Sequence, residues 1–582
     1  MTADGPKAGS GSGQSRPADR LILRGYGPLA ALVVLLLLVT MLVPSRPQED
    51  EQLTQFGGET TAGLAPAPGT APPAGNLPAG TAPTATGPQA AAGSPNAPVA
   101  PAAGSKGDRS GTAAVAGRTA KTCSGGAKQD GNSAYSPPCL VWDGKNNGGA
   151  TARGVTKDTI TIAYRDIGNP LGDSDSELAK TAEKKGIVAS PEATERTRAA
   201  LLEYFNRTYE LYGRKVKIVT YKGRGDAIKE LGGTGQEGAN ADGLKVAQEI
   251  GAFADMTAIS QPYLDALVRQ KVIAFGGLHL PSTYYRQRAP YAWGQLVDCT
   301  ALLSSAVDLI SKRLPPSGNA TRAGSAALRQ KPRKFGLVVP DDAVYAQCIN
   351  EARPKLKAAG VDFAKEIRYS LEIAKLQQEA PNMAAQLKAA GVTTVVLVTD
   401  PILPFFLSGS ATQQDFWPEW FLSGTVLTDA DVAGQFYDQD QWQFTYGQSY
   451  LADIKQGQAS ESYRAYKKIR DDEPTMTRDL DYYSLLMLFI GLQMAGPNLT
   501  PQTFARGLFS YPGADGPLGH WSWGPDDYTA IDDAREIYYD RRALSAFNNQ
   551  PGRYVSPSGT KRYRGSWPAQ APPVPTPPAA AP

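Results

Sequence analysis

The sequence has few of the side chains on which catalysis most often depends. Its 582 residues include only 2 histidines and 4 cysteines, and no two cysteines form a Cys-x-x-Cys pair. The Gly-x-Ser-x-Gly motif of α/β hydrolases and the His-Glu-x-x-His motif of zinc proteases are also missing from the sequence. We therefore expect a protein that is not an enzyme and that needs neither a cofactor nor a metal.

The sequence also has little excess of either positive or negative charge. The 59 Lys and Arg residues nearly balance the 56 Asp and Glu residues, which leaves a net charge of +3. A nucleic-acid-binding protein normally concentrates basic side chains on one face. The near-neutral balance therefore argues against a nucleic-acid partner.

Long apolar runs are limited to the N-terminal region. Leu29–Val43 carries no charge, and Lys7, Arg16, Arg20 and Arg24 precede it. Because basic flanks stay in the cytoplasm, this pattern predicts a cytoplasmic segment over residues 1–25 and export of everything after residues 26–45. Whether residues 26–45 form a transmembrane signal anchor or a cleaved signal peptide is left open by their length and flanks. We expect the remainder at the outer face of the cell membrane, or secreted if the segment is cleaved.

Large apolar residues are also rare in two low-complexity segments. Residues 46–120 consist mostly of Ala, Pro, Gly and Thr, a composition that cannot bury enough surface to fold and that predicts a disordered linker. Residues 567–582 have the same character and are predicted to form a disordered tail. Residues 121–566 have ordinary globular composition and form the predicted folded domain.

Within that domain, strand and helix patterns alternate twice. The first set runs from the β-branched strand Thr159–Ile167 to a strand that ends at Gly276-Gly277. The second set begins with the strand Lys334–Val339 and continues through a helix over Ala343–Ala359 and the strand Val392–Thr399. Short apolar strands alternating with amphipathic helices are typical of open parallel sheets. We predict an α/β fold with two Rossmann-like lobes joined by hinge strands, and a ligand site in the cleft between them.

The four cysteines lie in the exported part of the chain, where disulfides persist. Four cysteines allow three pairings, and sequence alone does not choose among them. Closeness along the chain favours Cys123 with Cys139 and Cys299 with Cys348.

Several segments resemble the periplasmic binding protein type I family, in its leucine/isoleucine/valine-binding branch. Gly154–Ile162 (GVTKDTITI) is similar to the family's entry into its first strand, and Ala258–Ser260 is similar to a strand followed by a serine turn. Val338–Tyr345 (VVPDDAVY) resembles the family's Asp-Asp-x-x-Tyr-Gly segment, and Gly391–Asp400 resembles a strand of its second lobe. The resemblance spans nearly the whole predicted domain.

This resemblance implies a hinged pair of lobes that binds an amino acid, an amide or a related compound and delivers it to an ABC permease. The implied ligand contacts are Ser260, the Gly276-Gly277 step and Tyr345. The sequence departs from the family where Gly276-Gly277 replaces a Ser/Thr anchor for an α-carboxylate, and where Ala346 replaces a glycine.

Residue chemistry supports the same candidate ligand-binding positions, each with a structural alternative. Ser260 and Gln261 precede a helix, where they would bind an anion or simply cap the helix. Gly276 and Gly277 would let backbone approach a ligand or form an ordinary turn. Tyr345 would close on a ligand or fill a hinge, and Asp400 would bind an ammonium group or cap the helix after Pro401.

A Gly-x-Gly-x-x-Gly sequence at Gly233–Gly238 lies a dozen residues after its nearest strand. A dinucleotide fingerprint follows a strand immediately, so we interpret this one as a surface loop. The leading function is thus a solute-binding protein for an ABC importer. The alternative is a membrane-tethered ligand sensor or envelope scaffold that works without a permease.

Overall fold

The computed structural model describes residues 121, 123, 126–166, 189–231, 234–452, 457–475 and 478–580. The predicted cytoplasmic segment, the apolar run and residues 46–120 all lie outside these residues. Within the described ranges, no helix combines the length and apolar character that a membrane crossing requires.

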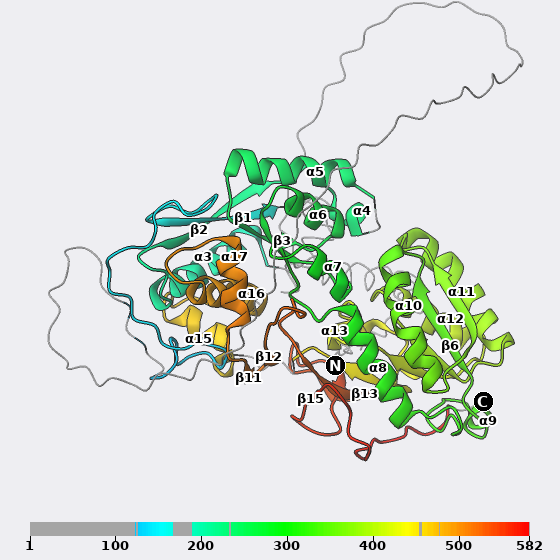
Figure 1. Cartoon of the computed structure of the whole chain (residues 1–582). Coiled ribbons are helices and arrows are strands. Elements are labelled where there is room, and N and C mark those ends of the chain that lie inside the picture. Colours follow the sequence, from blue (N-terminus) through cyan, green and yellow to red (C-terminus); the bar gives the residue numbers. More distant parts are fainter. Residues whose placement is uncertain are drawn as a thin grey trace, which may run out of the picture. The chain divides into compact units, whose positions relative to one another are not determined.

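Lobe 1 is built on a sheet of five parallel strands in the order β2-β1-β3-β4-β5. The strands alternate with helices that follow them in the chain, as the sequence pattern predicts (Figure 1). The strands are β1 (Thr159–Asp166), β2 (Lys215–Lys222), β3 (Ala254–Ala258), β4 (Ile273–Gly276) and β5 (Ala292–Trp293). The helices are α3 (Pro191–Thr208), α4 (Ala227–Leu231), α5 (Gln236–Leu244), a π-helix (Lys245–Ile250), α6 (Gln261–Arg269) and α7 (Ser282–Gln287).

A later part of the chain returns to complete lobe 1. It forms α15 (Glu461–Lys467), α16 (Arg478–Met494) and α17 (Pro501–Phe509), and both α15 and α16 pack against α3. From Leu485 to Gln493, α16 is buried on all sides, in agreement with the nearly continuous apolar sequence of that part. α17 begins with a capping box, in which the Thr500 and Thr503 side chains and backbone N–H groups bond reciprocally.

Lobe 2 is built on a larger sheet with the strand order β14-β13-β10-β9-β8-β6-β7, and β15 pairs with β13. Its parallel strands are β6 (Phe335–Pro340), β7 (Phe363–Tyr369), β8 (Thr394–Leu397), β9 (Glu419–Leu422) and β10 (Thr445–Ser449). Its helices are α8 (Cys299–Arg313), α9 (Ala326–Arg329), α10 (Ala343–Ala358), α11 (Ile373–Ala389), α12 (Leu403–Gln413), α13 (Asp431–Phe436) and α14 (Gln439–Trp442). The two predicted α/β lobes are therefore confirmed.

One edge of the lobe 2 sheet departs from the all-parallel prediction. β13 (Asp533–Leu544), β14 (Pro551–Val555) and β15 (Tyr563–Arg564) are antiparallel to their neighbours. These strands come after the last helix of lobe 1, so no further βα unit sets their direction. A separate hairpin of β11 (Ala514–Gly516) and β12 (Gly519–Trp521) precedes them.

The chain passes between the lobes three times. It leaves lobe 1 after β5, returns after β10 and crosses again before β13. The described residues of the crossing segments are 294–298, 450–452 with 457–460, and 522–532. Neither lobe is therefore formed from one continuous stretch of chain.

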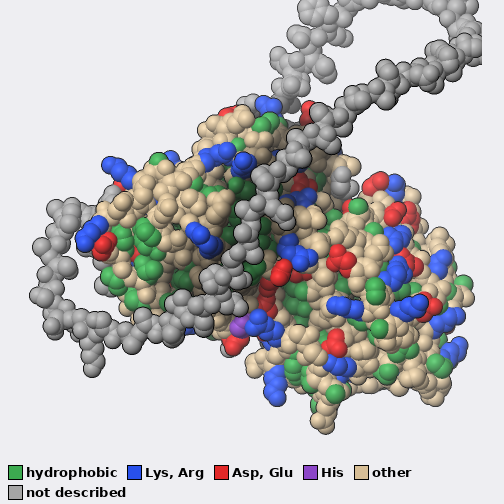
Figure 2. All heavy atoms as spheres, viewed as in Figure 1, with side chains coloured by type: hydrophobic (Ala, Val, Ile, Leu, Met, Phe, Trp, Pro, Cys, Tyr) green, Lys and Arg blue, Asp and Glu red, His purple; other side chains and the backbone are tan. Residues whose placement is uncertain are grey.

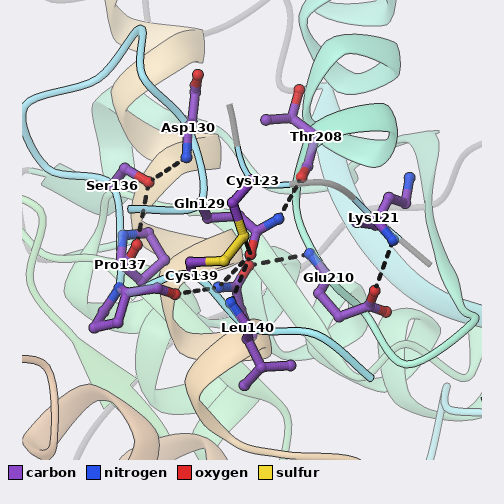
Figure 3. Close-up of a disulfide and its surroundings, with 12 residues drawn as sticks. Lys121, Cys123, Gln129, Asp130, Ser136, Pro137, Cys139, Leu140, Thr208 and Glu210 are labelled. Atoms are coloured by element: carbon purple, nitrogen blue, oxygen red, sulfur yellow. Dashed lines mark hydrogen bonds between the residues drawn. A yellow bond between two sulfur atoms is a disulfide. The ribbon is translucent and has the colours of Figure 1, made fainter. Parts of the chain in front are cut away.

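An N-terminal segment, residues 126–150, packs onto lobe 1 without joining its sheet. Cys123 and Cys139 are joined by a disulfide, and the side-chain oxygen of nearby Gln129 accepts a hydrogen bond from the Leu140 N–H at 3.0 Å (Figure 3). The Gln129 amide also donates to the Thr208 carbonyl at the end of α3. Sequence proximity favours this cysteine pairing.

The second disulfide joins Cys299, at the start of α8, to Cys348 in α10. It cross-links two helices of lobe 2, and both cysteines are buried. This is the other pairing that sequence proximity favours.

The C-terminal tail differs from the sequence expectation. Residues 567–580, which composition predicts to be disordered, lie in an irregular conformation along lobe 2. Partners from elsewhere in the chain hold this low-complexity segment in place. Buried Trp567 and several arginine side chains supply these contacts, and the composition of the tail does not reveal them.

Candidate ligand-binding site

Helix α7, which follows the carboxyl end of β4 in lobe 1, contacts the N-terminal parts of α8 and α10 in lobe 2. The Gln347 side-chain amide donates to the Thr283 hydroxyl at 2.9 Å, and the Ser282 N–H donates to the Thr300 hydroxyl at 3.3 Å. In open α/β sheets, ligands bind outside the carboxyl ends of the strands. The predicted site residues all lie at these ends.

Ser260 follows β3 and begins α6. Its hydroxyl oxygen accepts a hydrogen bond from the Tyr263 N–H, and the hydroxyl lies 2.5 Å from the Glu230 carboxylate. The side chain is buried and both of its hydrogen bonds are made within the protein, so it caps α6 and stabilises the turn before that helix. Gln261, the first residue of α6, is half-buried beside it.

The Glu230 carboxylate belongs to a buried ionic cluster that sequence reasoning missed. The Arg165 guanidinium lies 2.6 Å from Glu230 and 2.7 Å from Asp242, and it stacks over the Tyr263 ring at 4.1 Å. The side chains of Arg165, Glu230 and Asp242 are each only 1% exposed. These residues are far apart in sequence, so no local motif marks them. The cluster fixes the ends of β1 and β3 and holds the Ser260 turn in place.

Gly276 and Gly277 form a tight backbone step at the end of β4. Gly277 has φ +75°, and its N–H donates to the Ala258 carbonyl at 2.9 Å. A Cβ atom at Gly276 would lie only 2.1 Å from the same carbonyl oxygen. Close approach of β4 to β3 therefore explains this glycine without a ligand. The step ends near buried His279, whose Nδ1 lies 2.7 Å from the Val297 carbonyl oxygen.

Tyr345 and Asp400 are brought together at the ends of β6 and β8. Burial raises the pKa of the Tyr345 hydroxyl well above its usual range, and the nearby charges of Asp400 and Asp342 raise it further. Asp400 accepts hydrogen bonds from the Tyr369 hydroxyl and from the Ile402 N–H at the start of α12. Burial raises the pKa of Asp400 also. Asp400 thus has the helix-start contact that the structural alternative predicts.

The loop after β9, residues 423–430, is a second feature that sequence reasoning missed. Val426 and Leu427 have φ values of +44° and +62°, in the left-handed region that non-glycine residues rarely adopt. Such a conformation persists only where the surroundings impose it, and it is commonly found at binding sites. This segment, which we call the β9 loop, lies at the carboxyl edge of lobe 2.

Asp429 is a buried acidic residue of the β9 loop. Its side chain is 1% exposed, and neither carboxylate oxygen makes a well-formed hydrogen bond with the described residues. Burial raises the pKa of Asp429 to about 6, against the opposing effects of the nearby Ser449 hydroxyl and Arg535 guanidinium. A buried carboxylate without good hydrogen bonds is costly, and a ligand N–H or O–H group would satisfy it.

Lobe 2 also contains a small apolar cavity of about 20 Å³ between α8, α10 and the sheet. Its lining is aliphatic apart from Phe363 and Ser423. The cavity offers no charged group to a polar solute, so it belongs to the core of the lobe.

The prediction of a surface loop at Gly233–Gly238 is wrong in its second half. Gly235, with φ +72°, directly precedes α5, and Gly238 lies inside that helix. A Cβ at Gly238 would lie 2.6 Å from the Gly225 Cα, so close chain packing requires this glycine. Gly233 lies outside the described residues.

Residues 186–540 match the family described as periplasmic binding protein, and the chain belongs to this family. The matched region includes both sheets except β1, the end of β13, β14 and β15, as well as all three crossings between lobes. The description of the family is that of a binding protein. No curated protein matches the sequence.

Solved structures similar to this chain include solute-binding proteins of ABC transporters. One, from Rhodopseudomonas palustris BisB5 in complex with 3,4-dihydroxybenzoic acid, is 11% identical with a TM-score of 0.48, over 70% of this chain and 98% of that chain. Another is the leucine-, isoleucine-, valine-, threonine- and alanine-binding protein of Brucella ovis, 13% identical with a TM-score of 0.48, over 73% and 99%. A fatty acid ABC transporter substrate-binding protein from Thermomonospora curvata is 14% identical with a TM-score of 0.46, over 70% and 93%.

Proposed function

We propose that this chain is an extracytoplasmic solute-binding protein that captures a small polar ligand between its lobes and delivers it to an ABC permease. Membership of the periplasmic binding protein family is the observation that carries this proposal. The two lobes and their three crossing segments supply the hinged architecture that such capture needs. We further propose that residues 26–45 hold the protein at the outer face of the membrane, or direct its secretion if they are cleaved.

The ligand class follows from the polar groups at the strand ends. Asp429 would accept hydrogen bonds from an ammonium, amide or hydroxyl group, because its carboxylate oxygens make no well-formed hydrogen bond with the described residues. Gln261, the Gly276-Gly277 backbone and the Tyr345 hydroxyl are the proposed contacts around it. Ser260 and Asp400 would hold the surrounding residues of the ligand site in position, because both side chains already make hydrogen bonds within the protein. An amino acid, an amide or a related compound fits this set.

Native mass spectrometry of the exported domain tests the proposal. We expect a co-purifying small molecule bound once per chain, and calorimetry with that compound should give saturable binding. A ligand that binds only the folded state raises the free energy of unfolding, by about 2.7 kcal/mol at a concentration 100 times Kd. Failure of a broad library of amino acids, amides and polyols to raise the melting temperature would contradict the proposal.

A second candidate function is a membrane-tethered ligand sensor that works without a permease. It is favoured by the segments beyond the family match that pack onto the lobes, residues 126–150 and 567–580. The two functions differ in cells. Loss of the chain abolishes uptake of the bound solute if it serves an importer, and it leaves uptake unchanged if it serves a sensor.

A further inference from the structure

The C-terminal tail, residues 567–580, is fixed to lobe 2 at both of its ends (Figure 1). At the first end, Trp567 is 3% exposed, and its N–H donates to the Asp308 carboxylate at 2.7 Å. Its indole N–H lies 3.0 Å from both the carbonyl and the hydroxyl oxygen of Ser305 in α8. At the other end, the Ala580 N–H donates to the Gly324 carbonyl at 2.9 Å.

Between these ends, arginine side chains of lobe 2 donate to backbone carbonyls of the tail. The pairs are Arg313 with Ala569 at 3.3 Å, Arg322 with Pro575 at 3.5 Å, and Arg329 with Pro577 at 2.7 Å. A proline-rich segment suits this recognition, because its extended backbone keeps its carbonyls free of internal hydrogen bonds. It also loses little conformational entropy on binding. We call the surface formed by α8, α9 and these arginines the tail surface.

The tail surface distinguishes its ligand mainly through Trp567. Contacts to backbone carbonyls do not depend on side-chain identity, so any extended Pro- and Ala-rich segment would satisfy the arginines. The linker at residues 46–120 is such a segment in composition, and it contains no tryptophan. The buried indole therefore favours the tail over the linker.

A continuous set of hydrogen bonds leads from Trp567 to the β9 loop. The Ser305 hydroxyl, which the indole contacts, donates to the Gln448 side-chain oxygen at 2.9 Å. The Gln448 amide in turn donates to the Ser423 carbonyl at 3.0 Å, at the start of the loop that carries Asp429. Gln448 is fully buried and its bond to Ser423 is shielded from water, whereas the bonds that Ser305 makes are partly buried.

We propose that lobe 2 carries a binding site for proline-rich extended peptide, separate from the solute site, whose resident ligand is the chain's own tail and whose occupancy steadies the β9 loop. The peptide site stands on the tail contacts alone. Only the role of the β9 loop as a wall of the solute site rests on the proposed function.

A peptide supplied in trans tests the proposal in the full chain. A fluorescent peptide of residues 565–582 should bind the Trp567→Ala variant saturably. It should bind the unaltered chain at least about tenfold more weakly, because the tethered tail competes at a high effective concentration. Hydrogen exchange at residues 423–430, measured without any solute, should be about fivefold faster in the variant, and the peptide should slow it again.

Two matched variants separate recognition from general damage. On the Trp567→Ala background, Arg329→Ala should weaken peptide binding about fivefold. Arg541→Ala should leave it unchanged, since Arg541 pairs with Asp440 in an exposed position. If Trp567→Ala does not fold, Trp567→Phe keeps an apolar ring and removes the indole donor, and the same exchange measurement applies.

Absence of peptide binding, or equal binding of a peptide carrying Trp567→Ala, overturns the peptide site. Unchanged exchange of the β9 loop in every Trp567 variant overturns the coupling. Neither result depends on the transported solute, so both are distinguishable from failure of the solute-binding function.

Discussion

The Ala258 carbonyl oxygen lies where a side chain at Gly276 would have to go, only 2.1 Å from the place that a Cβ atom would take. The contact joins β3 to β4 at the carboxyl edge of lobe 1, next to the Ser260 turn. The geometry of this edge therefore depends on a residue without a side chain.

Gly276→Ala should lower the free energy of unfolding by about 2–4 kcal/mol, because backbone rather than a movable side chain opposes the added methyl group. Urea unfolding followed by circular dichroism measures the change. Gly409→Ala is the matched control, since Gly409 lies in α12 with open space around its Cβ position. That substitution should stabilise the protein by up to about 1 kcal/mol. Equal effects at the two positions would refute this explanation of Gly276.

Arg165→Met should lower the free energy of unfolding by about 3–5 kcal/mol, because it leaves the buried Glu230 and Asp242 carboxylates without a countercharge. Arg153→Met is the control, since Arg153 is exposed and its side chain donates a hydrogen bond to the Gln270 carbonyl at the surface. Denaturant titration of both variants at neutral pH measures the difference. A loss below about 1 kcal/mol for Arg165→Met would show that the cluster does not brace lobe 1.

His279 should make stability fall as the solution becomes acidic. Burial lowers the pKa of His279 to about 4 from its ordinary value of 6.5, so the folded state favours the neutral ring. The stabilisation is complete above pH 6.5 and is lost as pH falls toward 4. His279→Asn tolerates the φ of +52° at this position and removes the titrating ring. The stability difference between wild type and variant should shift between pH 6.5 and 4, and a constant difference would contradict the prediction.

The two disulfides should differ in their effect on stability. Replacing Cys299 and Cys348 with serine releases a loop of 49 residues and should cost about 4 kcal/mol, whereas replacing Cys123 and Cys139 releases 16 residues and should cost about 3 kcal/mol. Peptide mapping of the exported protein under non-reducing conditions should recover both pairs cross-linked. Free thiols at these positions would show that the disulfides do not form in the exported protein and would contradict the prediction.

The alternation of strands and helices was predictable because apolar residues recur at a different spacing in strands than in helices. α10 was expected over Ala343–Ala359 and spans Ala343–Ala358, with the Asp342 side chain accepting from the first N–H groups of the helix. The Ser260 cap and the helix start at Asp400 follow equally from local chemistry. These features depend on neighbours a few residues away in the chain.

Features that depend on tertiary contacts were not predictable. Arg165 meets Glu230 and Asp242 only after the sheet forms, and buried Asp429 lies near Ser449 of β10 and Arg535 of β13, which come later in the chain. The tail was misjudged for the same reason, since its partners lie in α8 and α9. Charged side chains of both signs are interspersed on the face shown in Figure 2, so charge does not mark a ligand site there either.

A small solute that binds between the lobes should satisfy Asp429. The most direct measurement is calorimetric titration of the co-purified solute into wild type and Asp429→Asn, with melting temperatures of both free proteins. We predict that Asp429→Asn is at least as stable as wild type above pH 6, because it removes a buried carboxylate whose pKa is raised, while its affinity falls about tenfold or more. Unchanged affinity in a folded Asp429→Asn variant would contradict this role of Asp429 and the solute site built around it.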